Sequence, residues 1–401
     1  MALASAFEGL PLARLRELRL VDRRFERVAS FVLRRRMQTA IKKTALSSLG
    51  GDLCDEIATK LARLRPDDVF VLSDQVTPWV VEKLTGNDAT SYWDRKQNKR
   101  VQTGYKRGTR TRVYTGEHKQ IPVSDQHGQL RYVDELHGPI RRSGTSKMHV
   151  KSMIGSRANR PLFVETGSAN LTSSAMKDNT ESVVILESPG IAKMFSEYAD
   201  EVVAGRRDRP AFSSALAGFN KRNPIGIRAA LAPFVNVGEL LTAELRGADR
   251  VLVRMFLVSA AKRGGDNQPL QALCDLAARG VEVTVVVDQG QSGEAYVAEA
   301  LGQLEDAGAT VHLETGPGGG GIMHDKLIFA HYPASPRKTD MDLPTPERWT
   351  VMVGSSGLTK NVIHNENYEN LLIIDDAALY SELMQHDRTA RSNTTYVTSR
   401  T

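Results

Sequence analysis

The sequence MHVK at residues 148–151, followed by TGSANLT at 166–172, recurs as MHDK at 323–326, followed by VGSSGLT at 353–359. Each copy gives His-x-Lys, then an apolar run, then Gly-Ser-x-x-Leu-Thr. A single His-x-Lys is too short to be informative, because it arises by chance in many chains of this length. Two copies in the same order, with matching residues downstream, indicate an internal duplication. We therefore expect both copies to contribute to one active site.

The similarity between the two parts of the chain continues beyond these motifs. Asn-x-Glu follows at 179–181 and again at 367–369, and each is followed by a strand-like apolar run, a turn and a helix. Residues 206–223 are rich in charge and in residues that interrupt regular structure, which is typical of a linker. The sequence therefore predicts an N-terminal half at 1–205 and a C-terminal half at 224–401.

A second repeated pattern predicts the fold class. Gly-Gly-Asp at 50–52 precedes a helical stretch and the buried strand 68–75, which ends in Asp-Gln. Gly-Gly-Asp at 264–266 likewise precedes a helix and the strand 281–289, which also ends in Asp-Gln. Apolar strands that alternate with helices are typical of α/β layers around an internal sheet. We interpret the two strands as equivalents, and the longer interval after the first one as a basic insertion near 85–130.

Composition and charge limit the class of protein. The chain is 41% hydrophobic and 25% charged, which is ordinary for a globular protein. No apolar run reaches the roughly 20 residues that span a membrane. The N-terminus lacks a basic start followed by an apolar segment, so no signal peptide is predicted, and a cytoplasmic protein or a mature secreted form is expected. The net charge of +6 favours an anionic partner, either nucleic acid or an acidic membrane surface.

Two basic segments are candidates for contact with such a partner. Residues 11–46 are expected to form a helix that packs on the core and exposes an arginine-rich face. Residues 92–119 carry nine Lys or Arg against two acids, with four aromatic residues between them. This mixture suits phosphate contacts with stacking on bases, or insertion into a lipid headgroup layer. It is equally compatible with a solvent-exposed β-hairpin, and the sequence leaves these alternatives open.

The repeated His-x-Lys places both side chains on one face of a strand. If the halves pack with pseudo-two-fold symmetry, two imidazoles and two ammonium groups meet, and the repeated glutamates can orient the histidines. This set suits phosphodiester chemistry without a metal. One neutral imidazole attacks phosphorus, the other protonates the leaving alcohol, and the lysines stabilise the phosphoryl oxygens. The predicted catalytic residues are His149, Lys151, Glu181, His324, Lys326 and Glu369.

Three polar side chains of the Gly-Ser motifs are predicted to donate hydrogen bonds to phosphate, namely Ser168, Asn170 and Ser355. No cofactor is predicted, because no nucleotide-binding motif accompanies the glycine-rich run that precedes the second His-x-Lys. No metal is predicted either. A lysine beside each histidine would repel a cation, and the chain has no His-x-x-x-His and no cluster of acids.

These motifs resemble the phospholipase D superfamily, whose signature is His-x-Lys-x4-Asp followed by Gly-Ser-x-Asn, usually present twice. The first copy matches Gly-Ser-x-Asn fully, whereas the second has Gly357 in place of the asparagine. The aspartate of the family is replaced by Ser156 in the first copy and by His331 in the second. The resemblance implies two duplicated α/β/α half-domains, each with a mixed sheet flanked by helices, and an active site at their pseudo-two-fold interface.

The resemblance also implies a metal-independent phosphodiesterase with a phosphohistidine intermediate, active as a monomer. Two motifs in one chain fit the lipid-directed members, so phospholipid hydrolysis or headgroup transfer, with peripheral contact to a membrane, is the first hypothesis. A nuclease or other nucleic-acid phosphodiesterase is the alternative, which the basic segment 92–119 and Gly-Ser-Ala-Asn-Leu-Thr favour. In the secreted bacterial phospholipases D the first histidine is the nucleophile, which suggests His149 here.

Overall fold

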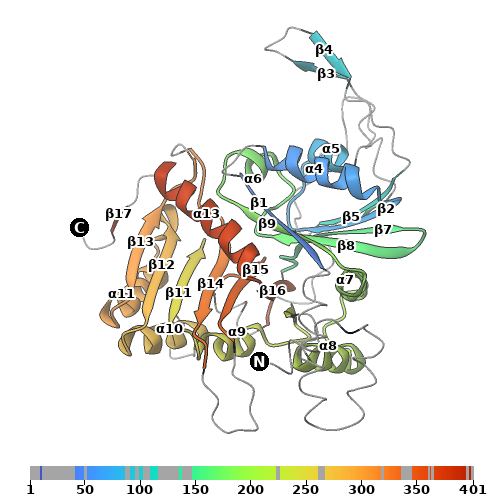
Figure 1. Cartoon of the computed structure of the whole chain (residues 1–401). Helices are drawn as coiled ribbons and strands as arrows, with labels where there is room; N and C mark the ends of the chain where they lie inside the picture. The colour runs from blue at the N-terminus through green and yellow to red at the C-terminus, as the bar shows by residue number, and fades with distance from the viewer. Residues whose placement is uncertain are drawn as a thin grey trace.

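Two large β-sheets lie side by side, with helices between them and around them, in the computed structural model of the chain (Figure 1). Structural statements below refer to the described residues, which are Leu10, 41–48, 52–85, 91–94, 99–102, 109–115, 135–137, 147–222, 226–260, 267–317, 320–335, 346–359, Val362, 365–393 and 397–398. Most of the helix expected at 11–46 and much of the basic segment 92–119 lie outside them.

Apart from β17 at the edge of the second sheet, both large sheets have the same order of strands, which confirms the duplication. One runs β1-β9-β8-β7-β2-β5-β6 and the other runs β10-β16-β15-β14-β11-β12-β13-β17. Both are mixed sheets, with two parallel pairs next to β2 in one and next to β11 in the other. The first sheet contains β1 (Lys42–Ser47), β2 (Asp68–Ser73), β5 (Arg110–Thr115), β6 (Glu135–His137), β7 (Lys151–Arg157), β8 (Arg160–Gly167) and β9 (Ser182–Glu187). The second contains β10 (Ile227–Ala232), β11 (Arg250–Met255), β12 (Glu282–Asp288), β13 (Thr310–Glu314), β14 (Lys326–Tyr332), β15 (Arg348–Gly354), β16 (Glu369–Asp375) and β17 (Val397–Thr398).

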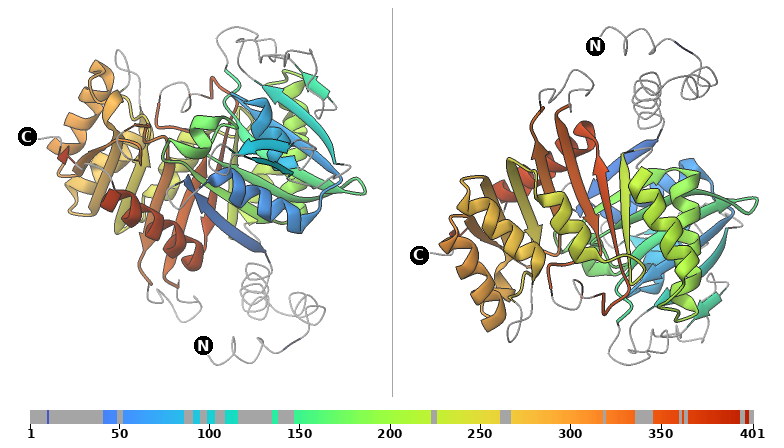
Figure 2. Two further views of the ribbon diagram at one scale, coloured as in Figure 1. Left: turned by 90° about the horizontal axis from the view of Figure 1, so that it is seen from above. Right: turned by 90° about the horizontal axis from the view of Figure 1, so that it is seen from below.

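Helices cover the outer face of each sheet and also pack between the sheets, where β15 contacts β8 and β9 directly (Figure 2). The first sheet is covered by α4, α5 and α6, and the second by α9, α10 and α11. Between the sheets lie α7, α8 and α13. These helices are α4 (Leu53–Leu64), α5 (Pro78–Thr85), α6 (Ser173–Lys177), α7 (Pro189–Val203), α8 (Pro210–Arg222), α9 (Val237–Leu245), α10 (Gln268–Ala278), the short 3-10 helix η3 (Gln289–Gln291), α11 (Ala295–Asp306) and α13 (Ala377–Asn393). No helix in the described part of the chain is long and apolar enough to cross a membrane.

One hydrophobic core joins the two halves. It combines Phe195 of α7, Leu383 of α13 and the facing side chains of both sheets, such as Ile154 and Phe329, all of them buried. Apolar runs such as SVVILE in β9 are buried on both faces, as expected for central strands in an α/β protein. Because a common core fixes the two sheets against each other, residues at their facing strand ends can form one rigid site.

The predicted equivalence of the strands at 68–75 and 281–289 is wrong. The strand order makes β2 the equivalent of β11, because each lies between an antiparallel and a parallel neighbour. The strand β12, at 282–288, instead corresponds to β5. The shared Asp-Gln is therefore a coincidence of sequence, and the interval from β2 to β7 is close in length to that from β11 to β14.

Three other predictions about local structure need correction. Residues 42–47, expected to end a helix, form the edge strand β1, which pairs antiparallel with β9. The basic segment 92–119 contains β5, a strand of the main sheet, so it is not wholly an insertion. Its first part forms a hairpin of β3 (Ser91–Asp94) and β4 (Lys99–Gln102), which projects beyond both large sheets (Figure 1). Most of the predicted linker at 206–223 is the helix α8, which buries Phe212 in the shared core.

Candidate active site

The two His-x-Lys motifs lie at the starts of β7 and β14, where the two halves of the chain meet. The backbone N–H of His149 donates to the carbonyl oxygen of Tyr368 at 3.0 Å, and that of His324 donates to Thr180 at 2.9 Å. The residue before each histidine makes an isolated parallel bridge to the same segment. Each histidine is thus fixed to the backbone that immediately precedes the glutamate of the other half.

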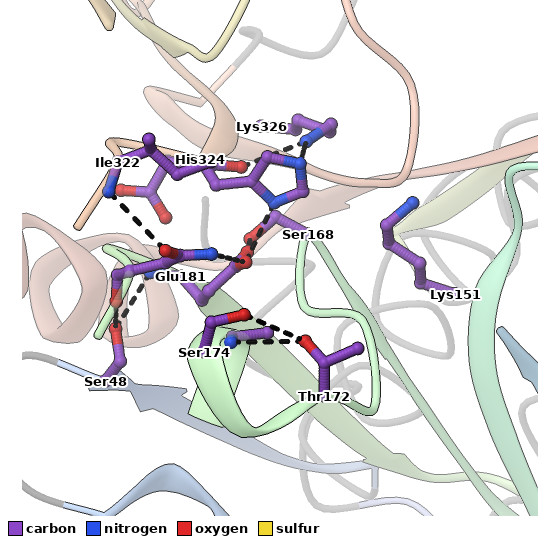
Figure 3. Close-up of polar contacts among 12 residues, drawn as sticks. Ser48, Lys151, Ser168, Thr172, Ser174, Glu181, Ile322, His324 and Lys326 are labelled. Carbon is purple, nitrogen blue, oxygen red and sulfur yellow. Dashed lines mark hydrogen bonds and ion pairs between the residues drawn. The ribbon is translucent and has the colours of Figure 1, made fainter. Parts of the chain in front are cut away.

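The glutamate of one half orients the histidine of the other. Nδ1 of His149 lies 2.9 Å from Oε1 of Glu369. Nδ1 of His324 lies 2.8 Å from Oε1 of Glu181 (Figure 3). Both carboxylates are completely buried. With Nδ1 bonded to a carboxylate, Nε2 of each ring remains for chemistry. The sequence predicted these four residues, but it did not reveal that the pairs cross between the halves.

Ser168 and Ser355 have a different role from the predicted phosphate binding. The Ser168 hydroxyl donates to Oε2 of Glu181 and accepts a backbone N–H at the start of β9 at 3.0 Å. The Ser355 hydroxyl donates to Oε2 of Glu369 and accepts a backbone N–H of β16 at 3.0 Å. Because a hydroxyl has one proton, neither serine can donate to phosphate in this arrangement. The structure therefore corrects the prediction: both serines hold the glutamates.

Asn367 and Asn179 complete the contacts of the glutamates and were not among the predicted site residues. Nδ2 of Asn367 lies 3.3 Å from Oε1 of Glu369, and its Oδ1 accepts the backbone N–H of Lys147 at 3.2 Å. Asn179 makes the same two kinds of contact in the other pair. Each asparagine links a glutamate to the segment before its histidine. The repeated Asn-x-Glu was the signal for this role, but its meaning depends on how the halves pack.

The two lysines are buried beside the histidines but make different contacts. Nζ of Lys151 donates to the carbonyl oxygen of His149 at 3.0 Å. Nζ of Lys326 donates to the carbonyl oxygen of His324 at 3.0 Å and also lies 3.1 Å from its Nε2. Figure 3 shows Lys326 and Lys151 on opposite sides of the space next to this imidazole. Among the described residues, a lysine–imidazole contact is therefore a property of the second pair.

Burial lowers the pKa of both histidines, more strongly for His149. Burial and the positive charges of Lys151 and Lys326 hold the pKa of His149 well below its usual value. Burial also lowers the pKa of His324, but the negative charge of Glu181 opposes the shift. His149 is therefore the imidazole with the stronger tendency to be neutral, and His324 is the one better able to carry a proton.

The glutamates and lysines of the site also have shifted pKa values. Burial raises the pKa of Glu369 to about 7. Burial alone would raise the pKa of Glu181 as well, but His324 and Lys326 hold it below its usual value. Burial lowers the pKa of Lys151 to about 8, and burial together with repulsion from Lys151 lowers that of Lys326 to about 7. The pKa shifts therefore favour the neutral forms of His149 and Glu369, whereas the pair of His324 and Glu181 is more strongly ionised.

A buried arginine network holds the residue inside the second His-x-Lys, and sequence reasoning missed it. Oδ2 of Asp325 accepts Nε of Arg254 at 2.9 Å, and its Oδ1 accepts the hydroxyl of Ser182 from the other half at 2.7 Å. Arg254 also binds Glu314 and Asp387, and all four charged side chains are nearly inaccessible. The first copy has a valine in place of the aspartate, so this network exists on one side of the site.

Asn170 lies buried in the first Gly-Ser motif, at 9% exposure, and its Oδ1 has no hydrogen-bond partner among the described residues. Its phosphate-binding role stays a prediction. The family's aspartate positions, Ser156 and His331, lie near the far ends of β7 and β14, about 16 Å along the strands from the lysines. Their departure from the signature therefore leaves the arrangement of the His-Lys pairs unchanged.

The assembled site presents two imidazole Nε2 atoms and two ammonium groups at one interface. This arrangement can place a nucleophile and a proton donor on opposite sides of a tetrahedral phosphorus, with positive charge around its oxygens. Groups of three or more His, Cys, Asp or Glu side chains suited to a metal ion do not occur within the described residues.

A match to known proteins decides the family. Residues 54–203 and 243–388 each match the family model described as cardiolipin synthase, PLD-like domain. The chain belongs to the phospholipase D superfamily. This superfamily comprises phosphodiesterases and phosphatidyltransferases, and the two matched segments confirm that its domain is present twice. No curated protein sequence matches the chain significantly.

Solved structures with the phospholipase D fold agree with this assignment. The chain is similar to the phosphatidylserine synthase of Haemophilus influenzae Rd KW20, with a TM-score of 0.56 and 12% identity over 88% of this chain and 87% of that one. It is also similar to the polyphosphate kinase of Porphyromonas gingivalis, with a TM-score of 0.54 and 12% identity over 92% of this chain. That match spans 50% of the kinase chain. At such identities the likeness concerns the fold alone.

Proposed function

We propose that this phospholipase D superfamily protein is a metal-independent phosphodiesterase that works through a phosphohistidine intermediate. The observation that supports this most strongly is the pair of crossed His–Glu contacts, 2.9 Å and 2.8 Å long, beside two buried lysines. A carboxylate on Nδ1 fixes the tautomer that leaves Nε2 free, once for a nucleophile and once for a proton carrier.

In the first step, the lone pair of Nε2 of His149 attacks phosphorus. The bond between phosphorus and the leaving oxygen breaks, and that oxygen takes the proton from Nε2 of His324. We assign the nucleophile to His149 because burial and two nearby lysines lower its pKa well below the usual value and favour the neutral ring. His324 begins this step protonated, because the negative charge of Glu181 opposes the lowering of its pKa by burial.

In the second step, neutral His324 takes a proton from water or an alcohol while the oxygen of that molecule attacks phosphorus. The phosphorus–nitrogen bond breaks and its electron pair returns to Nε2 of His149. Water gives hydrolysis, and an alcohol gives transfer of the phosphoryl group. Lys151 and Lys326 stabilise the charge on the phosphoryl oxygens in both steps, and we assign to the amide of Asn170 a hydrogen bond to one of them.

We propose a phospholipid as the substrate, with hydrolysis or headgroup transfer as the reaction. The family model that matches both halves is described as a cardiolipin synthase domain, and this supports the choice. A nucleic-acid phosphodiester is the second candidate. The hairpin β3–β4, with the sequence SYWD and KRVQ, favours it because basic and aromatic residues together suit contact with a polynucleotide.

Product analysis with both substrate classes tests the proposal. The protein is incubated in EDTA with mixed phospholipid vesicles, with single-stranded DNA and with RNA, and the products are separated. Release or exchange of the lipid headgroup supports the first candidate, and cleavage of DNA or RNA supports the second. Quenching in alkali, where phosphohistidine survives, followed by peptide mass analysis should locate the intermediate on His149. Complete loss of activity in EDTA would refute a metal-independent mechanism.

A further inference from the structure

The strand order makes one pair of positions equivalent across the site, yet the two residues there differ completely. Ser73 of β2 pairs with Lys151, and Met255 of β11 pairs with Lys326. The next residue in each half is therefore at the same place relative to its catalytic lysine. In the first half this residue is Asp74, and in the second it is Phe256. One side of the site thus has a carboxylate where the other has an aromatic ring.

The carboxylate on the first side is part of an ion pair. Oδ2 of Asp74 lies 2.7 Å from Nζ of Lys147, and the aspartate side chain is 2% exposed. Lys147 precedes the catalytic His-x-Lys and is two residues before His149. This side of the site therefore carries an ion pair in which the carboxylate is buried and the lysine is 40% exposed. An apolar group placed here would have to desolvate an ion pair.

The aromatic ring on the second side touches the catalytic groups directly. The centroid of the Phe256 ring lies 4.9 Å from that of the His324 ring in an edge-to-face arrangement, and 5.5 Å from Nζ of Lys326. The Phe256 side chain is only partly buried. Its backbone N–H donates to the carbonyl oxygen of Asp325 at 2.9 Å. Arg254, two residues earlier in the chain, is fixed by three carboxylates. The backbone that carries the ring is therefore fixed next to the strand that leads from His324.

We infer that Phe256 is a specificity-determining residue. Its ring contacts the alcohol that leaves from, or attacks, phosphorus next to His324, and it favours alcohols with an aromatic or apolar face. This inference rests on the proposed function, in which His324 exchanges the proton of that alcohol. Any group attached to this oxygen lies close to the imidazole of His324, and the Phe256 ring lies 4.9 Å from that imidazole, centroid to centroid. The paired charges at Asp74 and Lys147 offer no such surface on the nucleophile side.

Competition between two acceptor alcohols tests the contact between Phe256 and the alcohol without requiring the natural substrate. Bis(p-nitrophenyl) phosphate serves as donor and leaves p-nitrophenyl phosphate attached to His149. Methanol and benzyl alcohol then compete for this intermediate, giving methyl and benzyl p-nitrophenyl phosphate. The ratio of the two products does not depend on how much of a variant is folded, because both arise from the same active molecules. Parent, Phe256→Ala and Phe256→Leu are compared, with Phe219→Leu in α8 as a matched control remote from the site.

We expect the parent to prefer benzyl alcohol and Phe256→Ala to lose this preference by roughly two- to tenfold, the usual range for an aromatic contact. Phe256→Leu should fall between them, and the control should match the parent. An unchanged product ratio in Phe256→Ala would overturn the inference alone. The same holds if the parent releases p-nitrophenol but transfers to neither alcohol, or shows no preference for benzyl alcohol. A parent that releases no p-nitrophenol would overturn the proposed function and this inference with it.

Discussion

The His149 side and the His324 side of the site share the groups that orient the imidazoles and differ in the groups that surround them. Both have a buried glutamate from the other half, with a serine and an asparagine that hold it. Only the His324 side adds the lysine contact to Nε2, the Arg254 network and the ring of Phe256, within the described residues. The difference teaches that a symmetric scaffold can carry two unequal chemical steps when the surroundings of each imidazole have diverged.

The largest expected effects concern the different roles of His149 and His324, and leaving groups of different acidity distinguish these roles. His149→Ala removes the proposed nucleophile, so turnover should be undetectable with alkyl and with p-nitrophenyl phosphodiesters. His324→Ala should lose about 10²- to 10⁴-fold with an alkyl leaving group, which requires protonation. Release of p-nitrophenolate requires little protonation, so its single-turnover burst should survive much better in this variant. A burst that survives in His149→Ala instead would reverse the two roles.

Crossed pairing predicts which glutamate affects which histidine. Replacing a carboxylate that orients a histidine should lower kcat/KM by about 10- to 100-fold. Glu369→Gln should change the ring ¹⁵N resonances of His149, and Glu181→Gln should change those of His324, although both glutamates lie far from these histidines in sequence. Stability of each variant is checked by urea unfolding. The crossed arrangement fails if each substitution perturbs the histidine of its own half instead.

The lowered pKa values of Lys151 and Lys326 predict that activity falls while stability increases as the pH rises. Lys326 and Lys151 have pKa values of about 7 and about 8, below the ordinary value of about 10.4 in an unfolded chain. As pH rises through 7 to 8, the phosphoryl oxygens lose their positive partners and kcat/KM should fall. From there to about pH 10 the unfolded chain binds more protons at these two lysines than the folded chain does. Their contribution to the free energy of unfolding therefore increases as the pH rises. Rate profiles and urea midpoints measured at each pH check this, and a parallel decline of both would contradict it.

The smallest expected effect concerns the missing asparagine of the second copy. Asn170→Ala should lower kcat/KM by about tenfold, the value of one hydrogen bond to a charged group. Gly357→Asn should fold normally, because a Cβ at Gly357 would meet its nearest atom, the carbonyl oxygen of Leu257, at an ordinary 3.6 Å. Its effect on kcat/KM should be no more than about threefold, since the other side already supplies a donor. A gain in Gly357→Asn as large as the loss in Asn170→Ala would contradict this, because the second side would then bind phosphate as strongly as the first.

Sequence reasoning identified the fold and the six polar residues at the centre of the site, because duplication makes a motif and its spacing visible twice. It misjudged Ser168 and Ser355, since a hydroxyl can serve phosphate or carboxylate and packing decides which. It also missed β11, whose sequence RVLVRM looks too charged for a central strand. Arg254 is buried there only because Glu314, Asp325 and Asp387, distant in sequence, converge on it.

Backbone bridges on both sides of the site, from Met148 to Tyr368 and from Thr180 to Met323, tie each catalytic strand to the opposite half. Each half therefore lacks both the carboxylate that orients its own imidazole and the backbone that anchors it. Cutting the chain in the connection around α8 would yield two fragments, each with a histidine that lacks its orienting carboxylate. Reassociation of the fragments should restore both His–Glu pairs at once, as expected for two subunits of a dimer that are joined in one chain.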